Sequence, residues 1–296
     1  MVCVSALFIL YMIALPIAII AAIVDIYKTH KKNIEDYENS SYYKCTKIPY
    51  NRRKISLGKY GEYLTYCNLN KFEKTGAKLL FNLYIPKENG ETTEIDALMI
   101  CSKGIYVFES KNFSGWIFGS ENKKYWYQTL AAGRNGVHKE SFYNPIMQNT
   151  AHINHLRKFI GKEIPMRSII LFSDRCTLKN ISVKSNDVYV INRYKVSGII
   201  TQDCENIKND ILDENMIIEI YDKLFHYTQV ESTVKTQHIA NIQNNVITTN
   251  QKTFQRIKCP VCDGYLVERK VKDGWNVGEK FYGCSNYPKC RYTRNL

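Results

Sequence analysis

Acidic residues are scarce in this sequence. Its 296 residues include 28 Asp and Glu against 41 Lys and Arg, which gives a formal net charge of +13. An excess of this size indicates an anionic partner, either nucleic acid or the anionic face of a membrane. It carries no information about the fold.

Evenly spaced cysteines, internal repeats and strong compositional bias are also missing. Six of the ten cysteines are scattered without a repeating spacing, and the other four lie in the last 38 residues, which argues against a disulfide scaffold. The hydrophobic fraction is 45% and the charged fraction 23%. These values exclude a wholly disordered chain, a collagen and a polytopic transporter.

Charged residues are absent from Val2 to Val24. A helix of this length spans roughly 35 Å, and a hydrocarbon core is about 30 Å thick. The run is too long for the apolar region of a signal peptide, and no basic segment precedes it. We therefore expect an uncleaved transmembrane anchor over residues 1–27.

Basic residues follow this apolar run and none precedes it. Lys28, Lys31 and Lys32 come directly after it. The positive-inside rule then predicts a single-pass protein of the cell (inner) membrane with residues 28–296 in the cytoplasm. In that reducing compartment we expect the scattered cysteines to be free thiols.

Three further segments follow the anchor. Residues 28–55 are polar and rich in Tyr and Lys, and predict a tether. Residues 56–227 show apolar runs and helical periodicity typical of an α/β domain. Residues 228–255 are rich in Gln, Asn and Thr without Gly or Pro, and predict a linker. The clearest expected elements are strands at Lys78–Tyr84, Thr93–Cys101, Ile105–Glu109, Arg167–Phe172 and Asp187–Ile191, and helices at Gly58–Phe72, Pro145–Ile160 and Glu205–Phe225.

The last segment, residues 256–296, holds four cysteines with metal-binding spacing. Cys259 and Cys262 form a C-x2-C pair, and Cys284 and Cys290 form a wider second pair. Four unligated thiols are the alternative, but a short tail with little apolar content cannot build its own core, so a structural Zn²⁺ is expected. The segment carries nine Lys and Arg against four Asp and Glu, interleaved with aromatic residues.

The motif from Phe281 to Tyr292 (F-Y-G-C-S-N-Y-P-K-C-R-Y), together with C-P-V-C-D-G from Cys259, resembles the C-terminal zinc ribbons of bacterial type IA DNA topoisomerases. The resemblance implies DNA binding, with single strands favoured. It does not imply that the protein is a topoisomerase, because the chain has no room for that enzyme's catalytic body.

Asp96, Glu109 and Lys111 form the second chemically suggestive group. If Lys103 and Gly104 make a two-residue hairpin loop, Asp96 lies opposite Lys111, and all three side chains share one face. Two carboxylates and an ammonium suit Mg²⁺- or Mn²⁺-dependent hydrolysis of a phosphodiester. By itself D-x12-E-x-K is a weak signal, and a solvated strand end with an ion pair is the alternative.

Two flanking motifs strengthen the catalytic interpretation. G-x-x-G-E ends at Glu62, and N-P-x-x-Q ends at Gln148. With the Asp96 and Glu109-Ser-Lys111 strands, they resemble the NERD (nuclease-related) domain of the PD-(D/E)xK superfamily, from about residue 58 to residue 159. The resemblance implies a restriction-endonuclease-like mixed sheet flanked by helices and a site of Glu62, Asp96, Glu109, Lys111 and Gln148, with Asp96 and Glu109 holding the magnesium.

His152 and His155 follow Gln148 on the same expected helix. Such a pair is more typical of solvated or locally hydrogen-bonded histidines than of metal ligands. The sequence as a whole predicts a membrane-anchored, metal-dependent DNA nuclease with a DNA-binding zinc ribbon. The alternatives are a non-catalytic tether that holds DNA at the membrane and an accessory factor in DNA processing or RNA binding.

Overall fold

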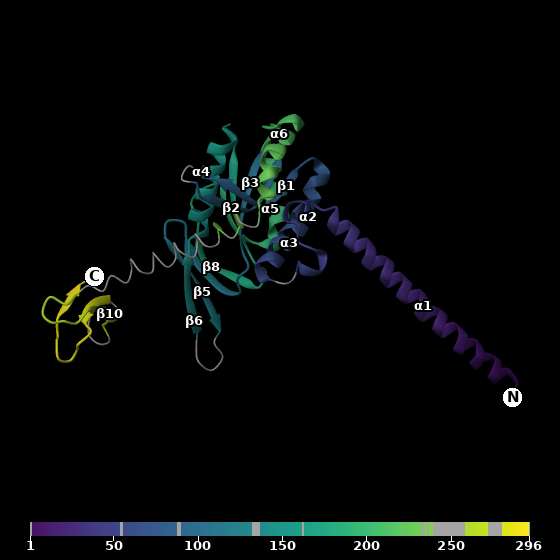
Figure 1. Cartoon of the computed structure of the whole chain (residues 1–296), viewed down its shortest axis with the longest axis horizontal. Coiled ribbons are helices and arrows are strands. Elements are labelled where there is room, and N and C mark those ends of the chain that lie inside the picture. The colour runs from purple at the N-terminus through teal and green to yellow at the C-terminus, as the bar shows by residue number, and fades with distance from the viewer. Residues whose placement is uncertain are drawn as a thin grey trace. The chain divides into compact units, whose positions relative to one another are not determined.

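The computed structural model describes residues 2–53, 56–87, 90–131, 137–161, 163–231, 234–235, 237–238, 258–271 and 280–295, with backbone alone for residues 2–13, 131, 137 and 295. The chain divides into two compact units, residues 1–235 and 236–296. The first unit contains a long N-terminal helix and an α/β body, and the second is a small three-stranded module (Figure 1). The predicted linker, residues 228–255, lies mostly outside the described residues.

Two sheets form the body of the first unit. A mixed five-stranded sheet has the order β1-β2-β3-β7-β9, in which β1, β2 and β3 pair antiparallel and β3, β7 and β9 pair parallel. A four-stranded sheet has the order β6-β5-β4-β8. The strands are β1 Lys78–Pro86, β2 Thr92–Cys101, β3 Gly104–Lys111, β4 Gly115–Ser120, β5 Tyr125–Ala131, β6 Val137–Tyr143, β7 Met166–Phe172, β8 Cys176–Ser182 and β9 Val188–Asn192.

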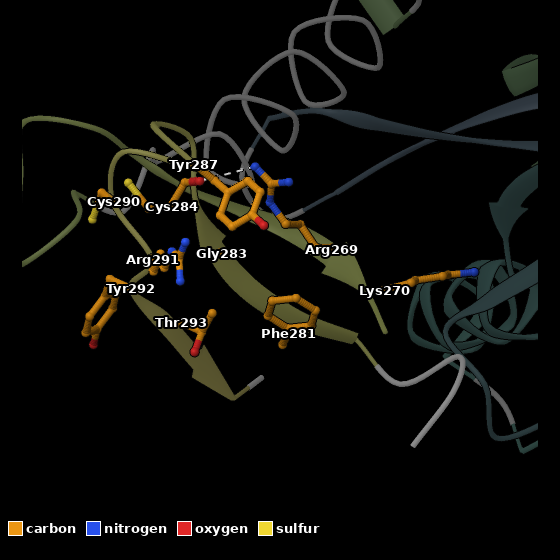
Figure 2. A pocket seen from close by; sticks show the side chains of 10 residues that line it. All are labelled: Arg269, Lys270, Phe281, Gly283, Cys284, Tyr287, Cys290, Arg291, Tyr292 and Thr293. Atoms are coloured by element: carbon orange, nitrogen blue, oxygen red, sulfur yellow. Dashed lines mark hydrogen bonds between the residues drawn. The ribbon is translucent and has the colours of Figure 1, made fainter. Parts of the chain in front are cut away.

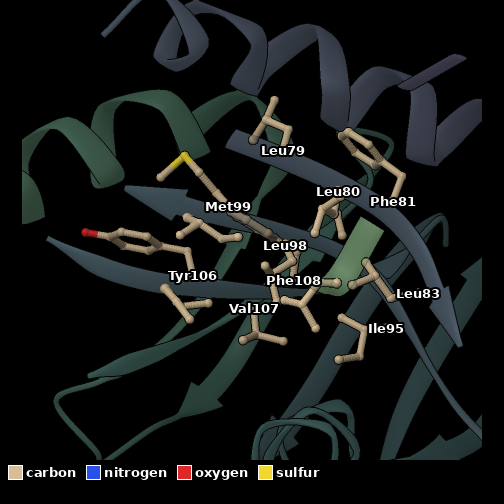
Figure 3. Packing of buried hydrophobic residues seen from close by; sticks show 14 of the residues in the cluster. Leu79, Leu80, Phe81, Leu83, Ile95, Leu98, Met99, Tyr106, Val107 and Phe108 are labelled. Carbon is tan, nitrogen blue, oxygen red and sulfur yellow. The ribbon is translucent and has the colours of Figure 1, made fainter. Parts of the chain in front are cut away.

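Helices pack against the five-stranded sheet and enclose its centre. They are α3 Leu57–Leu69, α4 Pro145–Ile160, α5 Val196–Asn206 and α6 Glu214–Phe225. Side chains of these helices and of β1, β2 and β3 belong to one buried cluster, and Figure 3 draws part of it on these three strands. Six successive residues of β3 are buried, so both faces of the central sheet are covered.

Local capping signals explain where the two helices beside the predicted site begin. The Ser56 side chain accepts a hydrogen bond from the Lys59 backbone N–H at the start of α3. The Asn144 side chain does the same for Ile146 at the start of α4, where Pro145 occupies the first turn. The helix predicted over Pro145–Ile160 is present with the predicted bounds.

The segment predicted as a tether is folded. α1 (Val2–Glu38) continues well past the apolar run, and α2 (Ser41–Thr46) follows it. Tyr42 is fully buried, with its ring 5.3 Å from that of Phe81 on β1. A tyrosine can bury its ring while its hydroxyl makes a hydrogen bond, and the Tyr42 hydroxyl donates to the Lys59 carbonyl. A Tyr-rich polar segment can therefore contribute to a core.

Two helices replace the single helix predicted over Glu205–Phe225. α5 ends at Asn206, and α6 begins after Asp213, whose side chain accepts a hydrogen bond from the Met216 N–H. Between them, the N–H groups of Ile211 and Leu212 donate to the carbonyl of Ser102. The segment between α5 and α6 is therefore hydrogen-bonded to the turn of the β2–β3 hairpin.

Within the part of the chain that the structure describes, no helix is both long and apolar enough to cross a bilayer. The first half of the predicted anchor, residues 2–13, has side chains outside the described residues.

Candidate functional site

The β2–β3 hairpin carries the central residues of the predicted site. Its turn lies one residue earlier than predicted, since Cys101 pairs with Gly104, and the register differs from the predicted one by two. Asp96 therefore lies across from Glu109 instead of Lys111. A shift of two leaves every side chain on its original face, so the predicted shared face is retained although the predicted turn was wrong.

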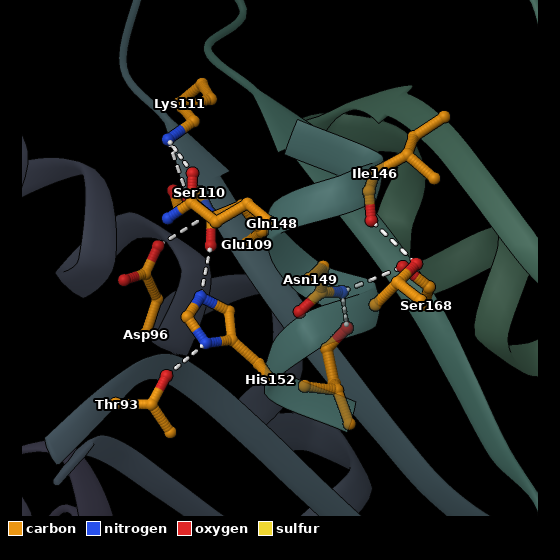
Figure 4. Close-up of polar contacts among 12 residues, drawn as sticks. Thr93, Asp96, Glu109, Ser110, Lys111, Ile146, Gln148, Asn149, His152 and Ser168 are labelled. Atoms are coloured by element: carbon orange, nitrogen blue, oxygen red, sulfur yellow. Dashed lines mark hydrogen bonds and ion pairs between the residues drawn. The ribbon is translucent and has the colours of Figure 1, made fainter. Parts of the chain in front are cut away.

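Glu109, Lys111 and Gln148 are in direct contact. The Lys111 ammonium lies 2.7 Å from Glu109 Oε1 and donates to Gln148 Oε1 at 3.1 Å (Figure 4). Glu109 is 2% exposed. Burial alone would raise its pKa, but Lys111 and His152 outweigh burial and hold the pKa below its usual value. The same carboxylate, with Asp96, raises the pKa of Lys111 against the opposing effect of burial.

Asp96 faces this ion pair from the neighbouring strand. Its Oδ2 accepts a hydrogen bond from the Ser110 backbone N–H at 2.8 Å. Burial raises the pKa of Asp96 well above its usual value, and the carboxylates of Glu109 and Glu62 raise it further. The pKa values of Asp96 and Glu109 are therefore shifted in opposite directions, although the two carboxylates lie on one face of the hairpin.

Glu62 approaches the same site from α3. Burial raises its pKa to about 7, and its Oε2 atom is buried without a hydrogen bond among the described residues. Asn82 on β1 lies next to it and opposes the pKa increase through a side-chain hydrogen bond. All five residues predicted from the sequence are thus brought together by α3, β2, β3 and α4.

Two site residues were missed in the sequence. His152 is 8% exposed, its Nδ1 lies 2.7 Å from Thr93 Oγ1, and its Nε2 lies 3.4 Å from Glu109 Oε2 (Figure 4). The interpretation of His152 as a solvated or locally bonded side chain was wrong. One signal was present, because His152 stands four residues after Gln148 and therefore shares its helix face.

Asn82 is the second missed residue. It has a left-handed backbone (φ 52°) in the middle of β1, between Phe81 and Leu83, which pair with the residues on either side of Asp96. Asparagine tolerates this conformation better than most residues. One signal was present, because Asn82 interrupts the apolar run from Leu79 to Ile85, and asparagine is depleted in strands.

The four C-terminal cysteines converge as predicted. Their sulfur atoms all lie within 4.8 Å of one another, with Cys262 and Cys284 3.4 Å apart and Cys259 and Cys290 3.8 Å apart. A tetrahedral zinc with bonds of about 2.3 Å separates its ligands by roughly 3.8 Å. The backbone N–H groups of Gly264 and Asn286 point to Cys262 and Cys284 at 3.4 Å, which favours thiolates. The cysteines are positioned to bind zinc.

A pocket of about 640 Å³ lies beside this centre, on strands β10 (Leu266–Lys270), β11 (Lys280–Cys284) and β12 (Thr293–Asn295). Three aromatic and three basic side chains contribute to its lining, namely Phe281, Tyr287, Tyr292, Arg269, Lys270 and Arg291 (Figure 2). The Arg269 guanidinium lies 5.5 Å from the ring of Tyr287, which is 60% exposed. Trp275, another aromatic of this segment, lies outside the described residues.

Comparison with known proteins agrees with both halves of this description. Residues 57–173 match the nuclease-related domain family, and residues 256–296 match the topoisomerase DNA-binding C4 zinc finger family. An uncharacterized protein of Bacillus anthracis is 30% identical over 188 residues, which are 63% of this chain and 84% of that protein. DNA topoisomerase 1 of Archaeoglobus fulgidus is 51% identical over 39 residues, 13% of this chain and 5% of the topoisomerase.

The fold, the acidic site and the cysteine centre together define a nuclease-related protein with a DNA-binding zinc ribbon. The chain belongs to the NERD, or nuclease-related domain, family. The match to the topoisomerase spans 39 residues, and the topoisomerase zinc finger family matches residues 256–296.

Proposed function

We propose that this protein is a membrane-anchored, metal-dependent nuclease that hydrolyses DNA phosphodiester bonds. One observation carries the proposal: Asp96, Glu109 and Lys111 meet on one sheet face, with Gln148 bonded to the lysine. The mixed sheet flanked by helices supports the restriction-endonuclease-like fold that the sequence predicts. The alternative interpretation, in which these residues form a solvated strand end, is inconsistent with the burial of Glu109.

The carboxylates fit a divalent cation. Glu109 Oε2 and Glu62 Oε2 are buried oxygens without hydrogen bonds among the described residues. Burial raises the pKa of Asp96, and the carboxylates of Glu109 and Glu62 add to that increase. A cation bound between Asp96 and Glu109 would relieve this repulsion and use the free oxygen lone pairs. Hard oxygen ligands of this kind suit Mg²⁺ or Mn²⁺.

The chemistry divides between the ion and the side chains. Magnesium bound by Asp96 and Glu109 would polarise the phosphate and lower the pKa of a bound water. Lys111, held 2.7 Å from Glu109, stabilises negative charge that develops on the phosphate. Gln148 restrains the lysine through its 3.1 Å hydrogen bond, and so aligns the ammonium with the scissile group.

The ribbon pocket supports a preference for single strands. Its exposed Tyr287 offers a ring face for an unpaired base, and Arg269, Lys270 and Arg291 suit the phosphates. In a duplex the bases already stack on one another and leave no face for the ring.

The described part of α1 supports membrane anchoring. Ile17, Ile20 and Ile26 are each more than 60% exposed. Large aliphatic side chains exposed along one helix are stabilised by burial in lipid. The cytoplasmic orientation rests on the basic residues that follow the apolar run.

A cleavage assay tests the proposal. Full-length protein in detergent should cut labelled DNA when Mg²⁺ is supplied and should not cut it when Ca²⁺ replaces Mg²⁺. A chelator is unsuitable, because it would also remove zinc from the ribbon. Asp96→Asn, Glu109→Gln and Lys111→Met should each lower the rate about 100-fold or more. Glu91→Gln, which removes a surface carboxylate paired with Lys87 at 3.6 Å, should leave the rate unchanged.

Two outcomes would contradict the proposal. Protein that binds every tested DNA but cuts none with Mg²⁺ or Mn²⁺ would favour the non-catalytic tether. Cleavage that persists in the Asp96→Asn, Glu109→Gln double variant would mean that the site lies elsewhere.

A further inference from the structure

The four-stranded sheet exposes a row of aromatic side chains that the proposed active site does not use. Trp116 on β4, Tyr125 and Tyr127 on β5, and Tyr143 on β6 are each between 41% and 54% exposed. Exposed aromatics gathered on one surface are unusual in a protein without a partner there. We call this surface the aromatic face.

Strand register places these side chains on one side of the sheet. Tyr125 pairs with Tyr143, and Trp116 pairs with Thr129, two residues from Tyr127 on the same strand. The opposite side is buried: Trp126 is fully enclosed and stacks on Phe172 of the five-stranded sheet with an interplanar angle of 7°. The aromatic face is therefore the solvent side of a sheet whose other side belongs to the core.

Lysines accompany the rings on this face. The ammonium of Lys139 lies 4.1 Å from the Tyr127 ring centroid, and that of Lys179 lies 5.4 Å from Trp116. Lys124 lies 5.5 Å from Tyr125. Each of these three rings thus has a lysine so close that one nucleotide could stack its base on the ring and place its phosphate on the ammonium.

Carboxylates are missing from the same face. Within the described residues of β4, β5, β6 and β8, the single acidic residue is Glu140, which pairs with the buried Gln128 and so belongs to the other side of the sheet. Its carboxylate contacts His138 at 2.8 Å. Glu121, in the turn that also holds Lys124, accepts hydrogen bonds from the Ser185 side chain and from the backbone N–H groups of Lys184 and Ser185. The strands of the face therefore combine aromatic rings with lysines, which is complementary to a polyanion.

Two connections join the aromatic face to the proposed active site. β3 ends at Lys111, and β4 begins four residues later at Gly115. Beside it, Phe172 at the end of β7 pairs with Lys111, and Cys176 at the start of β8 pairs with Gly115. The neighbouring strands β3 and β7 of the five-stranded sheet therefore continue, through short connections, into the neighbouring strands β4 and β8 of the four-stranded sheet. These connections begin at Lys111 and Phe172, beside the proposed active site.

We propose that the aromatic face binds single-stranded nucleic acid, with bases stacked on its rings and phosphates on its lysines. Base–aromatic stacking needs unpaired bases, and it tolerates any base because each has a π-face. The position beside Lys111 makes the face a guide for the strand entering or leaving the active site. That role rests on the proposed nuclease function, but binding to the face does not.

Tryptophan fluorescence tests the binding directly. The chain has three tryptophans, so Trp275→Phe leaves exposed Trp116 and buried Trp126 in the full-length protein. Oligothymidine added with Ca²⁺ in place of Mg²⁺ should quench part of this emission, and Trp116→Phe in the same background should abolish the quenching. Absence of quenching, or equal quenching without Trp116, would overturn the proposal.

Affinity measurements provide the second arm. Trp116→Ala with Tyr127→Ala should weaken binding of a single-stranded oligonucleotide by about tenfold or more, because each stacked base contributes about 1–3 kcal/mol. Trp116→Phe with Tyr127→Phe should bind like the parent, since both rings remain. Ile218→Ala, which removes a 39% exposed apolar side chain on α6, is the control and should have no effect.

The remaining outcomes separate the aromatic face from other partners and from catalysis. If the alanine variant loses affinity for vesicles of anionic lipid but not for the oligonucleotide, the face is a membrane surface and the proposal is wrong. Quenching that persists in Asp96→Asn, whether or not the parent protein cuts DNA, shows that the face binds independently of the active site.

Discussion

Glu109 depends on two neighbours for its orientation. Lys111 contacts Oε1 of the Glu109 carboxylate, and Nε2 of the His152 ring faces Oε2. Among the described residues, neither Nε2 nor Oε2 makes a hydrogen bond to any other group. The ionised Glu109 carboxylate can only accept, so it favours the tautomer that carries the proton on Nε2. In that tautomer the Thr93 hydroxyl donates to Nδ1 at 2.7 Å and helps to hold the ring in place.

Substitution of His152 should therefore change the metal requirement. His152→Ala should raise the Mg²⁺ concentration for half-maximal cleavage by about 10- to 100-fold, as expected when a partner of a ligating carboxylate is lost. Thr93→Val, which keeps the shape and removes the hydroxyl, should change it in the same direction, and Thr93→Ser should resemble the parent. The measurement is cleavage rate as a function of Mg²⁺ concentration.

A loss of rate at saturating Mg²⁺ with an unchanged half-maximal concentration would contradict this positioning role. It would indicate instead that His152 acts on the substrate. Thermal unfolding of each variant controls for a general loss of structure.

At the scale of elements, α3 is positioned by a close approach at one glycine. A Cβ atom at Gly61 would lie 3.2 Å from the Arg193 guanidinium and 3.2 Å from the Asn112 side chain, whereas Gly58 faces open space. Arg193 is 1% exposed, so it has little room to move. The second glycine of G-x-x-G-E therefore allows α3 to bring Glu62 to the site.

The two glycines should respond in opposite directions to alanine. Gly58→Ala should stabilise the protein by about 0.5 kcal/mol, because alanine loses less backbone entropy in a helix. Gly61→Ala should destabilise it by about 1 kcal/mol or more, because overpacking against Arg193 outweighs the same gain. Urea unfolding measures both changes. Equal stabilisation by the two substitutions would show that Arg193 and Asn112 move without cost.

At the scale of the whole molecule, the two units have separate cores. The ribbon cluster consists of its four cysteines and Leu266, with partly buried Tyr282 and Tyr292 packed against them. A core this small depends on its metal for stability. The nuclease-related unit has its own large apolar cluster.

Loss of zinc should therefore unfold the ribbon alone. Cys262→Ser should abolish binding of one zinc per chain, weaken DNA binding about tenfold and reduce the dependence of affinity on salt. The unfolding transition of the first unit should stay unchanged. Cys67→Ser, at an exposed cysteine outside the ribbon, is the control. Zinc analysis and DNA binding at several salt concentrations test this, and a variant that keeps its zinc would contradict the four-cysteine site.

Membrane orientation is a second prediction for the whole molecule. The uncharged run and the following Lys28, Lys31 and Lys32 predict that the C-terminus is cytoplasmic. A reporter fused after Leu296 should be active when it requires the cytoplasm and inactive when it requires export. Reporter activity outside the cytoplasm would contradict the predicted orientation. Recovery of the protein in the fraction without membranes would contradict the predicted anchor.

Features that depend on neighbouring residues could be predicted from the sequence. Asn144 and Pro145 mark the start of α4, and the cysteine spacing identifies the zinc ribbon. Alternation along β2 and β3 placed Asp96 and Glu109 on one face even though the turn was wrong by one residue. Caps, knuckles and strand alternation are local, so a short window of sequence is sufficient to determine them.

Features that depend on distant residues were decided by the tertiary structure. His152 is a site residue because Thr93, 59 positions away, and Glu109 meet its ring, and Asn82 takes a left-handed backbone opposite Asp96. The segment around Tyr42 is polar in composition yet buries its rings against β1. These outcomes depend on which surfaces pack together, and packing between remote segments overrides the local preference of each one.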